Sequence, residues 1–311
     1  MANQTAITEF LLLGFSDIRE LQILHFVLFL VIYLSSLMVH LLIITAIALD
    51  HNIHSPMYFF LMNLSILDLG SISVTIPKSM VNSLMNTRSI SYSGCVTQVF
   101  FFIFFIFADL ALLTVMAYDR YVAICQPLHY ERVMNRRACV QMAAGAWISG
   151  ILNSVLHTTN TFAISFCGDN MVNQFFCDIP QLLKLACCGS DLGEIVVISL
   201  NVLLSLSGFT FIVVSYVQIF KTVLRIPSEQ GRHKAFSTCL PHVTVISLLL
   251  STGFFAFLKP SSSSTLGQDL FLAVLYSIIP PVMNPIIYSM RNKEIKGALS
   301  KLIGISLFKK N

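Results

Sequence analysis

The chain has 311 residues, of which 56% are hydrophobic and only 11% carry a charge. A mean hydropathy of +0.79 excludes a soluble globular protein of this size, because too few charged side chains are present to cover its surface. The net charge of +4 is dispersed over several connections, so nothing in the charge pattern indicates a nucleic-acid partner.

Seven apolar stretches are long enough to span a membrane, and short polar connections separate them. Between them the sequence shows no linker or repeat of domain size, which predicts an all-α membrane protein, a single seven-transmembrane helix bundle over residues 1–311. Of the 19 Lys and Arg residues, 14 fall on the side of the C-terminus when alternate connections are assigned to alternate sides. By the positive-inside rule, residues 1–22 are extracellular and the tail, residues 291–311, is cytoplasmic. The predicted spans are 24–48, 57–80, 96–118, 139–158, 195–220, 238–258 and 270–290.

The N-terminal segment carries Asn3 in an Asn-Gln-Thr tripeptide, an acceptor pattern for N-linked glycosylation. The pattern is short, and Asn63 matches it inside a predicted helix where no glycan fits. No cationic leader with a small-residue cleavage site is found, so we expect the first spanning helix to be the insertion signal. The apolar centre of that helix contains His40, which is costly there unless it is paired.

Two acidic residues are predicted to lie inside the membrane. Asp68 is in the middle of the second helix, which starts at Pro56, and Asp109 is about 21 Å along the third helix from Cys95. Intramembrane carboxylates seldom face lipid, so Asp109 marks the inward stripe of its helix. Alternating steps of four and three place eight side chains on this stripe: Cys95, Val99, Phe102, Ile106, Asp109, Leu113, Met116 and Arg120.

The outer connection over residues 159–191 contains four cysteines. With Cys95 they make five cysteines in an oxidising compartment, and the sequence alone leaves their pairing open. A zinc site is the competing reading, but no histidine lies beside them at zinc-finger spacing. The four are Cys167, Cys177, Cys187 and Cys188.

The last spanning helix contains Asn284 and Pro285. A helical proline leaves a carbonyl of the preceding turn without its donor, which creates a hinge and a place for water. Asp68, Asp109 and Asn284 lie on three helices at similar depth, so they are a candidate cluster for a sodium ion or for water. Alternatively, Asp68 and Asp109 are protonated and neutral, and they bind no ion. No other cofactor is indicated.

Several separated motifs stand out along the chain: PMYFFL at 56–61, MAYDRYVAIC at 116–125, KAFSTCLPH at 234–242 and PPVMNPIIYS at 280–289. They resemble those of the olfactory receptors, a branch of the rhodopsin-like G-protein-coupled receptors, and the resemblance covers essentially the whole chain. The family usually has a Gly-Asn pair at His40, Glu at Asp109 and Ser at Pro241, so the chain departs from its pattern there.

The resemblance implies two disulfides, Cys95 to Cys177 and Cys167 to Cys187, and leaves Cys188 without an assigned partner. It also implies a cytoplasmic switch that couples to a heterotrimeric stimulatory olfactory G protein and raises cAMP. The residues that it assigns to switching and coupling are Asp119, Arg120, Tyr121, Tyr216, Lys234, His242, Asn284, Pro285 and Tyr288.

Two expectations concern how polar groups are held inside the bundle. His40 either donates a hydrogen bond to Asp68, in place of the usual Asn, or is a tolerated polar residue facing a cavity. In the resting state, Arg120 is expected to be held by Asp119 and by polar groups of the sixth helix.

Polar residues gather in the inner half of the bundle, whereas the outer half is rich in Phe, Ile, Leu and Val. This distribution favours an occluded apolar pocket above the switch and a ligand that is small, volatile and mostly apolar. The residues expected to line the pocket are Phe102, Ile103, Ile106, Phe107, Asn201, Leu204, Leu250, Gly253, Phe254, Phe257 and Ser277.

The resemblance therefore implies an odorant receptor of the plasma membrane, with the cilia of olfactory sensory neurons as the expected location. A non-olfactory rhodopsin-like small-molecule receptor is the nearest alternative. A transporter is more distant, because it would need polar residues along a full path. The sequence shows no nucleophile and base, or metal ligands, that would converge in the cleft of an enzyme. The tail alternates basic and apolar residues like an amphipathic helix lying on the membrane.

Overall fold

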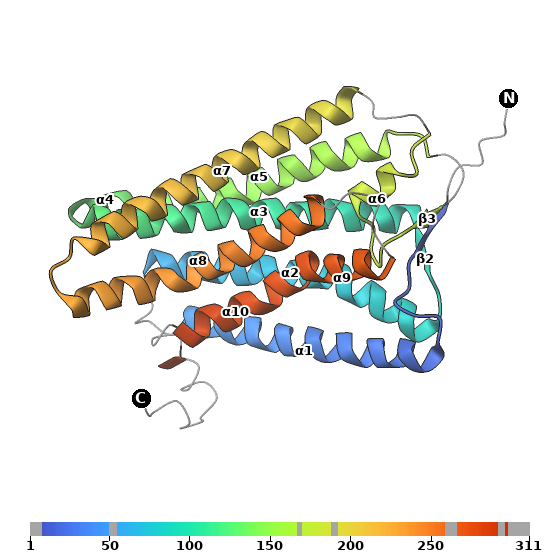
Figure 1. Cartoon of the computed structure of the whole chain (residues 1–311), viewed down its shortest axis with the longest axis horizontal. Helices are drawn as coiled ribbons and strands as arrows, with labels where there is room; N and C mark the ends of the chain where they lie inside the picture. Colours follow the sequence, from blue (N-terminus) through green and yellow to red (C-terminus); the bar gives the residue numbers. More distant parts are fainter. Residues whose placement is uncertain are drawn as a thin grey trace.

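The computed structural model describes residues 8–49, 55–166, 170–187, 192–258, 266–291 and 296–297. Within these ranges, seven segments are long and apolar enough to cross a membrane, which confirms the seven predicted spans. Figure 1 shows their helices side by side along the long axis of the molecule. Six spans are single helices: α1 (Arg19–Leu49), α2 (Pro56–Met85), α3 (Tyr92–Cys125), α5 (Arg136–Phe162), α7 (Leu192–Leu224) and α8 (Glu229–Leu258).

Polar caps help to set the ends of α2, α3 and α5, which extend beyond the predicted apolar stretches. The Ser91 hydroxyl accepts a hydrogen bond from the Gly94 N–H at the start of α3, and the Asn135 side chain accepts one from Ala138 at the start of α5. Each satisfies a backbone donor that the first helical turn leaves unpaired. At the other end of α2, Asn86 takes the left-handed conformation with φ of 51° and stops the helix.

The seventh span is two helices, α9 (Leu266–Ser277) and α10 (Ile279–Arg291), instead of the single helix predicted over 270–290. The interruption falls at Ile278, two residues before Pro280 and Pro281. Neither proline has an N–H to donate to the preceding turn, so the helical hydrogen bonding cannot continue through this point.

Helix α3 occupies the centre of the bundle (Figure 1) and packs closely against α5. The face of α5 that meets it carries small side chains, which lets the two backbones approach. A Cβ atom on Gly150 would lie only 2.8 Å from the Phe104 carbonyl oxygen. One turn further, the Ser154 hydroxyl donates a hydrogen bond to the Phe100 carbonyl. The buried residues of this face are Cys139, Ala143, Ala146, Gly150, Ser154, Thr158 and Thr161.

A small sheet that the sequence did not predict closes the outer end of the bundle, at the right of Figure 1. Its order is β2-β1-β3, with β1 antiparallel to β2 and parallel to β3. The sheet ties the N-terminal segment to the outer connections on both sides of it. Its strands are β1 (Glu9–Leu12), β2 (Ser89–Ser91) and β3 (Met171–Val172), and the remaining short elements are η1 (Pro127–His129), α4 (Tyr130–Val133) and α6 (Ile179–Leu183).

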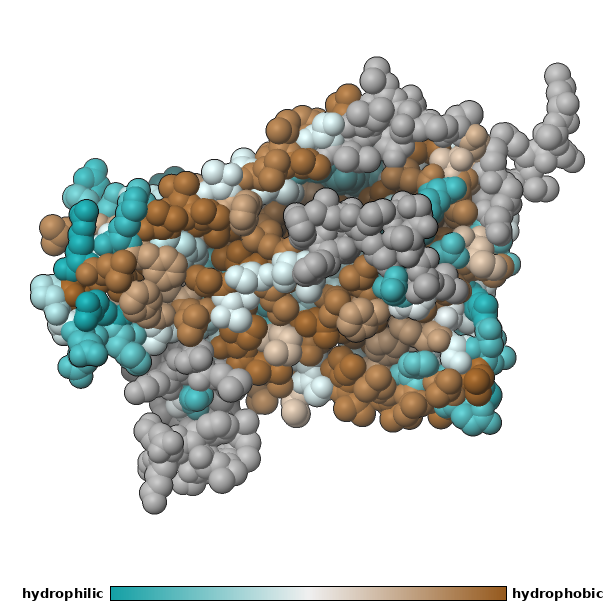
Figure 2. Space-filling model, in the orientation of Figure 1, coloured by the Kyte–Doolittle hydropathy of each residue, from teal (hydrophilic) through white to brown (hydrophobic). Residues whose placement is uncertain are grey.

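The visible surface divides into zones as a membrane protein requires. In Figure 2, hydrophobic residues cover the middle of the molecule, and hydrophilic residues gather at its two ends. Large apolar side chains such as Leu203 and Leu152 are more than 60% exposed in that middle zone. An apolar surface of this extent is stable only against lipid.

Candidate ligand pocket and intracellular switch

Aromatic side chains from three elements meet in the outer half of the bundle. Phe102 on α3 is buried, and its ring centre lies 4.8 Å from Phe176 and 6.2 Å from Tyr276 on α9. Ile106, one turn further into the membrane, packs against the same cluster. The sequence placed Phe102 and Ile106 correctly on the inward stripe, but it did not indicate the contributions of Phe176 and Tyr276.

The segment around Cys177 forms a roof over this cluster. The Cys95–Cys177 disulfide, with a Cα–Cα distance of 5.5 Å, fixes the roof to the outer end of α3 and confirms the implied bridge. The Gln98 side chain reinforces it, because its Oε1 accepts from the Cys177 N–H and its Nε2 donates to the Val74 carbonyl. The roof is thus tied to α3 and, through Gln98, to α2.

Asp178 fastens the same roof to the seventh span. The Tyr276 hydroxyl donates a hydrogen bond to the Asp178 carboxylate. Burial raises the pKa of Asp178 to about 6, although this hydrogen bond and the charge of Lys184 oppose the rise. The carboxyl is therefore close to its titration point in mildly acidic surroundings.

The second implied bridge falls partly outside the described residues, because Cys167 and Cys188 are not among them. Cys187 is disulfide-bonded. The adjoining segments lie together, since Phe166 and Ala186 form an antiparallel bridge and the Cys187 N–H donates to the Ser165 carbonyl. Among the described residues, no group of three or more His, Cys, Asp or Glu side chains could hold a metal.

The other residues expected to line the ligand pocket lie in different parts of the bundle. Leu204 is 55% exposed on the lipid-facing side of α7, so we remove it from the ligand set. Ile103 packs against the outer cluster beneath the sheet, and Leu250 packs against the inner core. The Ser277 hydroxyl is satisfied by the Ala273 carbonyl, and no atom of the described residues would lie within 4 Å of a Cβ on Gly253. The side chains of Phe254 and Phe257 lie outside the described part of the structure.

A polar pair lies between α5 and α7: Asn201, which the sequence placed in the ligand pocket, and His157, which it did not single out. His157 is next to Asn201, and Phe107 stacks on its imidazole with ring centres 5.8 Å apart. His157 Nε2 and Asn201 Oδ1 are buried and have no partner at hydrogen-bonding geometry among the described residues. A histidine inside an apolar span indicates a functional polar residue, and this signal applies to His157 as it does to His40.

The inner polar cluster forms as expected from the sequence. The Asn284 amide donates to both carboxylate oxygens of Asp68, at 3.0 and 3.1 Å. Asp109 is close enough to Asp68 for their charges to interact, and its Oδ1 has no described partner. Two carboxyl groups and an amide, with Asp109 Oδ1 and Asn284 Oδ1 unpaired among the described residues, form a set of oxygen ligands that fits a monovalent cation, or one shared proton.

His40 does not bond to Asp68, so that expectation is wrong. Its Nε2 donates to the Pro281 carbonyl at 3.0 Å. Pro281 lies four residues before Pro285, and Pro285 has no N–H with which to pair that carbonyl. His40 therefore satisfies the acceptor that the helical proline leaves open.

The cytoplasmic end contains two side-chain pairs. Arg120 forms an ion pair with Asp119, and Asp119 also accepts a hydrogen bond from Tyr130 at 2.8 Å. Burial and the neighbouring Asp119 carboxylate raise the pKa of Tyr130, which keeps its proton in this bond. Tyr216 on α7 shares a hydrogen bond with His242 on α8.

One detail of the switch differs from expectation. Among the described residues, no hydrogen bond joins Arg120 to α8, so Asp119 alone holds it, while His242 pairs with Tyr216 instead. Tyr288 is buried and its hydroxyl has no described partner. Tyr121 accepts a long hydrogen bond from Gln126, and the Lys234 side chain lies outside the described part.

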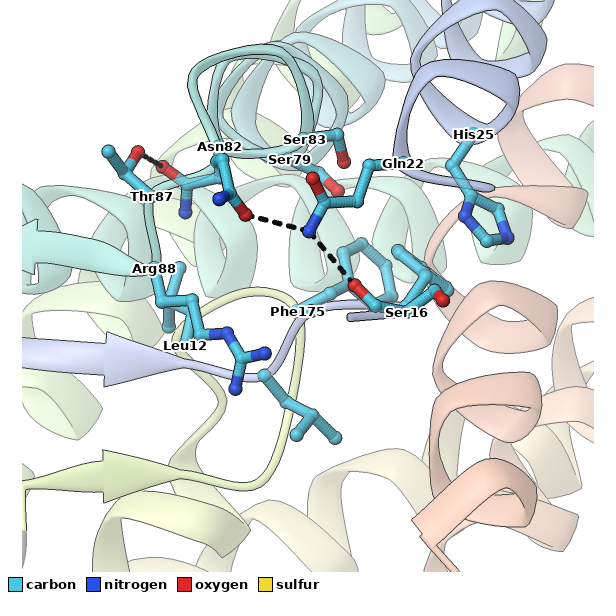
Figure 3. Close-up of a pocket in the computed structure, with 14 residues that line it drawn as sticks. Leu12, Ser16, Gln22, His25, Ser79, Asn82, Ser83, Thr87, Arg88 and Phe175 are labelled. Carbon is cyan, nitrogen blue, oxygen red and sulfur yellow. Dashed lines mark hydrogen bonds between the residues drawn. The ribbon is translucent and has the colours of Figure 1, made fainter. Parts of the chain in front are cut away.

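A separate polar pocket lies at the outer ends of α1 and α2 (Figure 3). The Gln22 amide crosses it, donating to the Asn86 side chain at 2.8 Å and to the Ser16 carbonyl at 3.1 Å. Its volume of about 20 Å³ is enough for a water molecule and far below that of a ligand pocket. We therefore assign it to the packing of the N-terminal segment.

Comparison with known proteins gives consistent results. The model of a family described as "Olfactory receptor" matches residues 29–305. Human olfactory receptor 14A16 is 54% identical over 310 residues, covering 100% of both chains, and human olfactory receptor 14I1 is 54% identical over 97% of both. The crystal structure of squid rhodopsin has a similar fold, with a TM-score of 0.73 at 14% identity over 93% of this chain and 87% of that one.

Proposed function

Because the chain belongs to the olfactory receptor family, we propose that it binds a small, mostly apolar odorant in the outer half of the bundle and raises cAMP through a stimulatory olfactory G protein. Family membership makes it a multi-pass membrane receptor that signals, and not an enzyme. The ligand class, the pocket and the particular G protein belong to the proposal.

The roofed aromatic cluster carries the proposal for the ligand. Phe102, Phe176 and Tyr276 present apolar surface beneath a segment that is anchored to α3, α2 and α9. A charged ligand there would lose its hydration without an opposite charge to replace it, whereas an apolar one gains from burial. Below it, the unpartnered atoms of His157 and Asn201 favour a ligand with one polar group, such as a hydroxyl or carbonyl.

A broad odorant screen tests this part of the proposal. Cells that express the receptor are exposed to neutral, cationic and anionic volatiles while cAMP is recorded. We expect the active compounds to be neutral, and potency to fall in Phe102→Ala but not in Leu204→Ala. Responses confined to charged compounds would refute the apolar pocket, and substrate flux without cAMP would favour a transporter.

The ion pair at the cytoplasmic end supports the proposed coupling. Arg120 is largely buried beside Asp119 and can contact a partner only after α8 and its neighbours move. We expect Arg120→Ala to abolish the cAMP response while surface labelling stays near the wild-type level. A surface-expressed variant that signals normally would remove Arg120 from the mechanism, and loss of signal in proportion to surface loss would make it a membrane anchor.

The inner cluster of Asp68, Asp109 and Asn284 is proposed to hold a sodium ion. Replacing sodium by a large organic cation should then change agonist potency in the wild type and leave Asp68→Asn unaffected. An unchanged wild type would favour two protonated acids.

We also propose that the receptor resides in the cilia of olfactory sensory neurons and is glycosylated at Asn3, which lies outside the described residues. Glycosidase treatment should increase the gel mobility of the wild type and leave Asn3→Gln unchanged. Immunolabelling of olfactory epithelium tests the location.

A further inference from the structure

An apolar cavity of about 190 Å³ lies between α7 and α8 near their cytoplasmic ends. Phe220 lines it from α7, and Phe236, Cys239, Leu240 and Val243 line it from α8. Its size exceeds that of an engineered cavity of about 150 Å³ that binds benzene. It therefore has room for a stretch of hydrocarbon chain.

The cavity opens toward lipid at the depth of the inner leaflet. Phe220 lies four residues before the end of α7, about 6 Å in, and Leu240 lies eleven residues after the start of α8, about 16 Å in. Leu240 is 44% exposed and Phe236 is 36% exposed, whereas Cys239 behind them is buried. An acyl chain of the inner leaflet can thus enter without crossing the protein.

Basic residues adjoin the lining residues in sequence at the cytoplasmic ends of α7 and α8. Lys221 follows the lining residue Phe220, Arg225 lies in the turn after α7, and Arg232 precedes His233, which also lines the cavity. Glu229 is the one acid in this turn and the first two turns of α8. Figure 1 shows that this short turn joins α7 and α8, so the basic residues of both helices belong to the same end of the bundle.

We propose that this cavity is a binding site for an anionic phospholipid, with one acyl chain between α7 and α8 and the phosphate group among Lys221, Arg225 and Arg232. Each basic residue contributes about 1 kcal/mol of attraction to an anionic membrane surface. The cavity adds selectivity for a lipid over a free anion, because the chain gains apolar contacts that a soluble phosphate cannot make.

The position of the site connects the lipid to the switch. The Phe220 ring lies 5.6 Å from Phe236 and 6.2 Å from Tyr216, and Tyr216 shares its hydrogen bond with His242. A chain seated between Phe220 and Leu240 bridges the inner ends of both helices. The bound lipid thus opposes their separation.

Photolabelling of the purified full-length receptor tests the proposal. The receptor is placed in nanodiscs of phosphatidylcholine with a minor fraction of phosphatidylserine, and either lipid carries a diazirine on its acyl chain. We expect phosphatidylserine to label residues 220–243 more strongly than phosphatidylcholine does. Lys221→Gln with Arg232→Gln should reduce that preference by up to roughly 30-fold, which corresponds to about 1 kcal/mol per residue.

Variants that change the cavity distinguish lipid binding at a specific site from general contact between the protein and the bilayer. Leu240→Trp fills the cavity and should reduce phosphatidylserine labelling several-fold, whereas Leu240→Ala should retain it. Leu203→Trp makes the same change on the lipid-facing surface of α7, where Leu203 is 63% exposed, and should have no effect. Equal labelling by the two lipids, or unchanged labelling in a correctly folded Leu240→Trp, would overturn the proposal. Because labelling needs no odorant, this result is independent of the proposed function.

Discussion

Several buried polar side chains in this bundle pair with groups on helices that are far apart in sequence. Asn284 pairs with Asp68, Tyr216 with His242, and His40 with the Pro281 carbonyl. In a membrane no water replaces a lost partner, so each pair fixes the register of two helices. Among the described buried atoms that lack a hydrogen-bond partner, those of Asp109, His157 and Asn201 lie where an ion or a ligand is proposed.

The bond from His40 to Pro281 yields the first prediction. His40→Leu keeps most of the volume but removes the donor, and an unpaired buried carbonyl costs about 1–3 kcal/mol. We expect a lower apparent melting temperature of the purified receptor in His40→Leu and partial recovery in His40→Asn, which retains an N–H donor. If Leu matched the wild type while Asn did not, shape and not hydrogen bonding would be the role of His40.

The second prediction concerns Asp178 and pH. The pKa of Asp178 is about 6 in the folded receptor and lower in the unfolded chain, so the folded state binds the proton more tightly. The resulting stabilisation is full below about pH 4 and is lost as the pH rises through 6. We expect acidification from pH 7.5 to 5 to raise the apparent melting temperature of the wild type relative to Asp178→Asn, which stays neutral and can still accept from Tyr276.

Melting the two proteins in parallel cancels the contributions of other titrating groups. Equal shifts in wild type and Asp178→Asn would show that Asp178 does not carry the effect.

At this scale the sequence predicted which residues are buried better than which atoms they bond. The inward stripe of α3 was placed correctly from Cys95 to Met116, because helical periodicity fixes a face. The hydrogen-bond partner of His40 was not predicted correctly. It is a backbone carbonyl 241 residues away, and helical periodicity contains no information about contacts between distant segments.

Close contact between helix backbones, and not the size of apolar side chains, governs the interface of α3 and α5. Gly150, Ser154 and the alanines of α5 leave room for the α3 backbone, and the Ser154 hydroxyl reaches its Phe100 carbonyl. Such interfaces tolerate little added volume, because a backbone atom cannot rotate away as a side chain can.

The third prediction compares the same substitution, Gly to Ala, at two glycines of α5. A methyl group at Gly150 would lie 2.8 Å from the Phe104 carbonyl oxygen, so Gly150→Ala should destabilise the receptor by about 1–3 kcal/mol. At Gly145 nothing lies within 4 Å, so Gly145→Ala should stabilise by up to about 1 kcal/mol through helix propensity. The test is to measure the melting temperature and the surface expression of both variants. A Gly150→Ala variant as stable as the wild type would mean that α3 and α5 can move apart at little cost.

The elements themselves were predicted to different degrees. All seven spans were found because a run of about twenty apolar residues seldom occurs outside a membrane helix. The sheet of β1, β2 and β3 was missed because strands of two to four residues carry no measurable period. The break at Ile278 is predictable from Pro280 and Pro281, because neither has the N–H that continuous helical hydrogen bonding requires.

On the scale of the whole molecule, the outer end is closed by a sheet and a disulfide, whereas the described ties at the inner end are single side-chain pairs. The sheet, the roof and the disulfide join the N-terminal segment, α2, α3 and the outer loop into one structure over the aromatic cluster. At the inner end, α7 and α8 enclose a cavity and meet through single pairs such as Tyr216 and His242. A ligand below the roof is thus positioned to change the end that is free to move.

The last prediction tests whether the outer end acts as one unit. The bridge between Cys95 and Cys177 closes a loop across 82 residues, which on a chain-entropy estimate contributes about 4 kcal/mol, and it also holds the roof against Gln98. Cys95→Ser and Cys177→Ser should therefore each nearly abolish surface expression. Since both remove the same bond, the double variant should be no worse than either single one. Cys125→Ser changes a free cysteine at the cytoplasmic side and should leave surface labelling unchanged. Additive losses in the double variant would mean that the two cysteines act through different partners in the cell, and that the roof is held by other contacts.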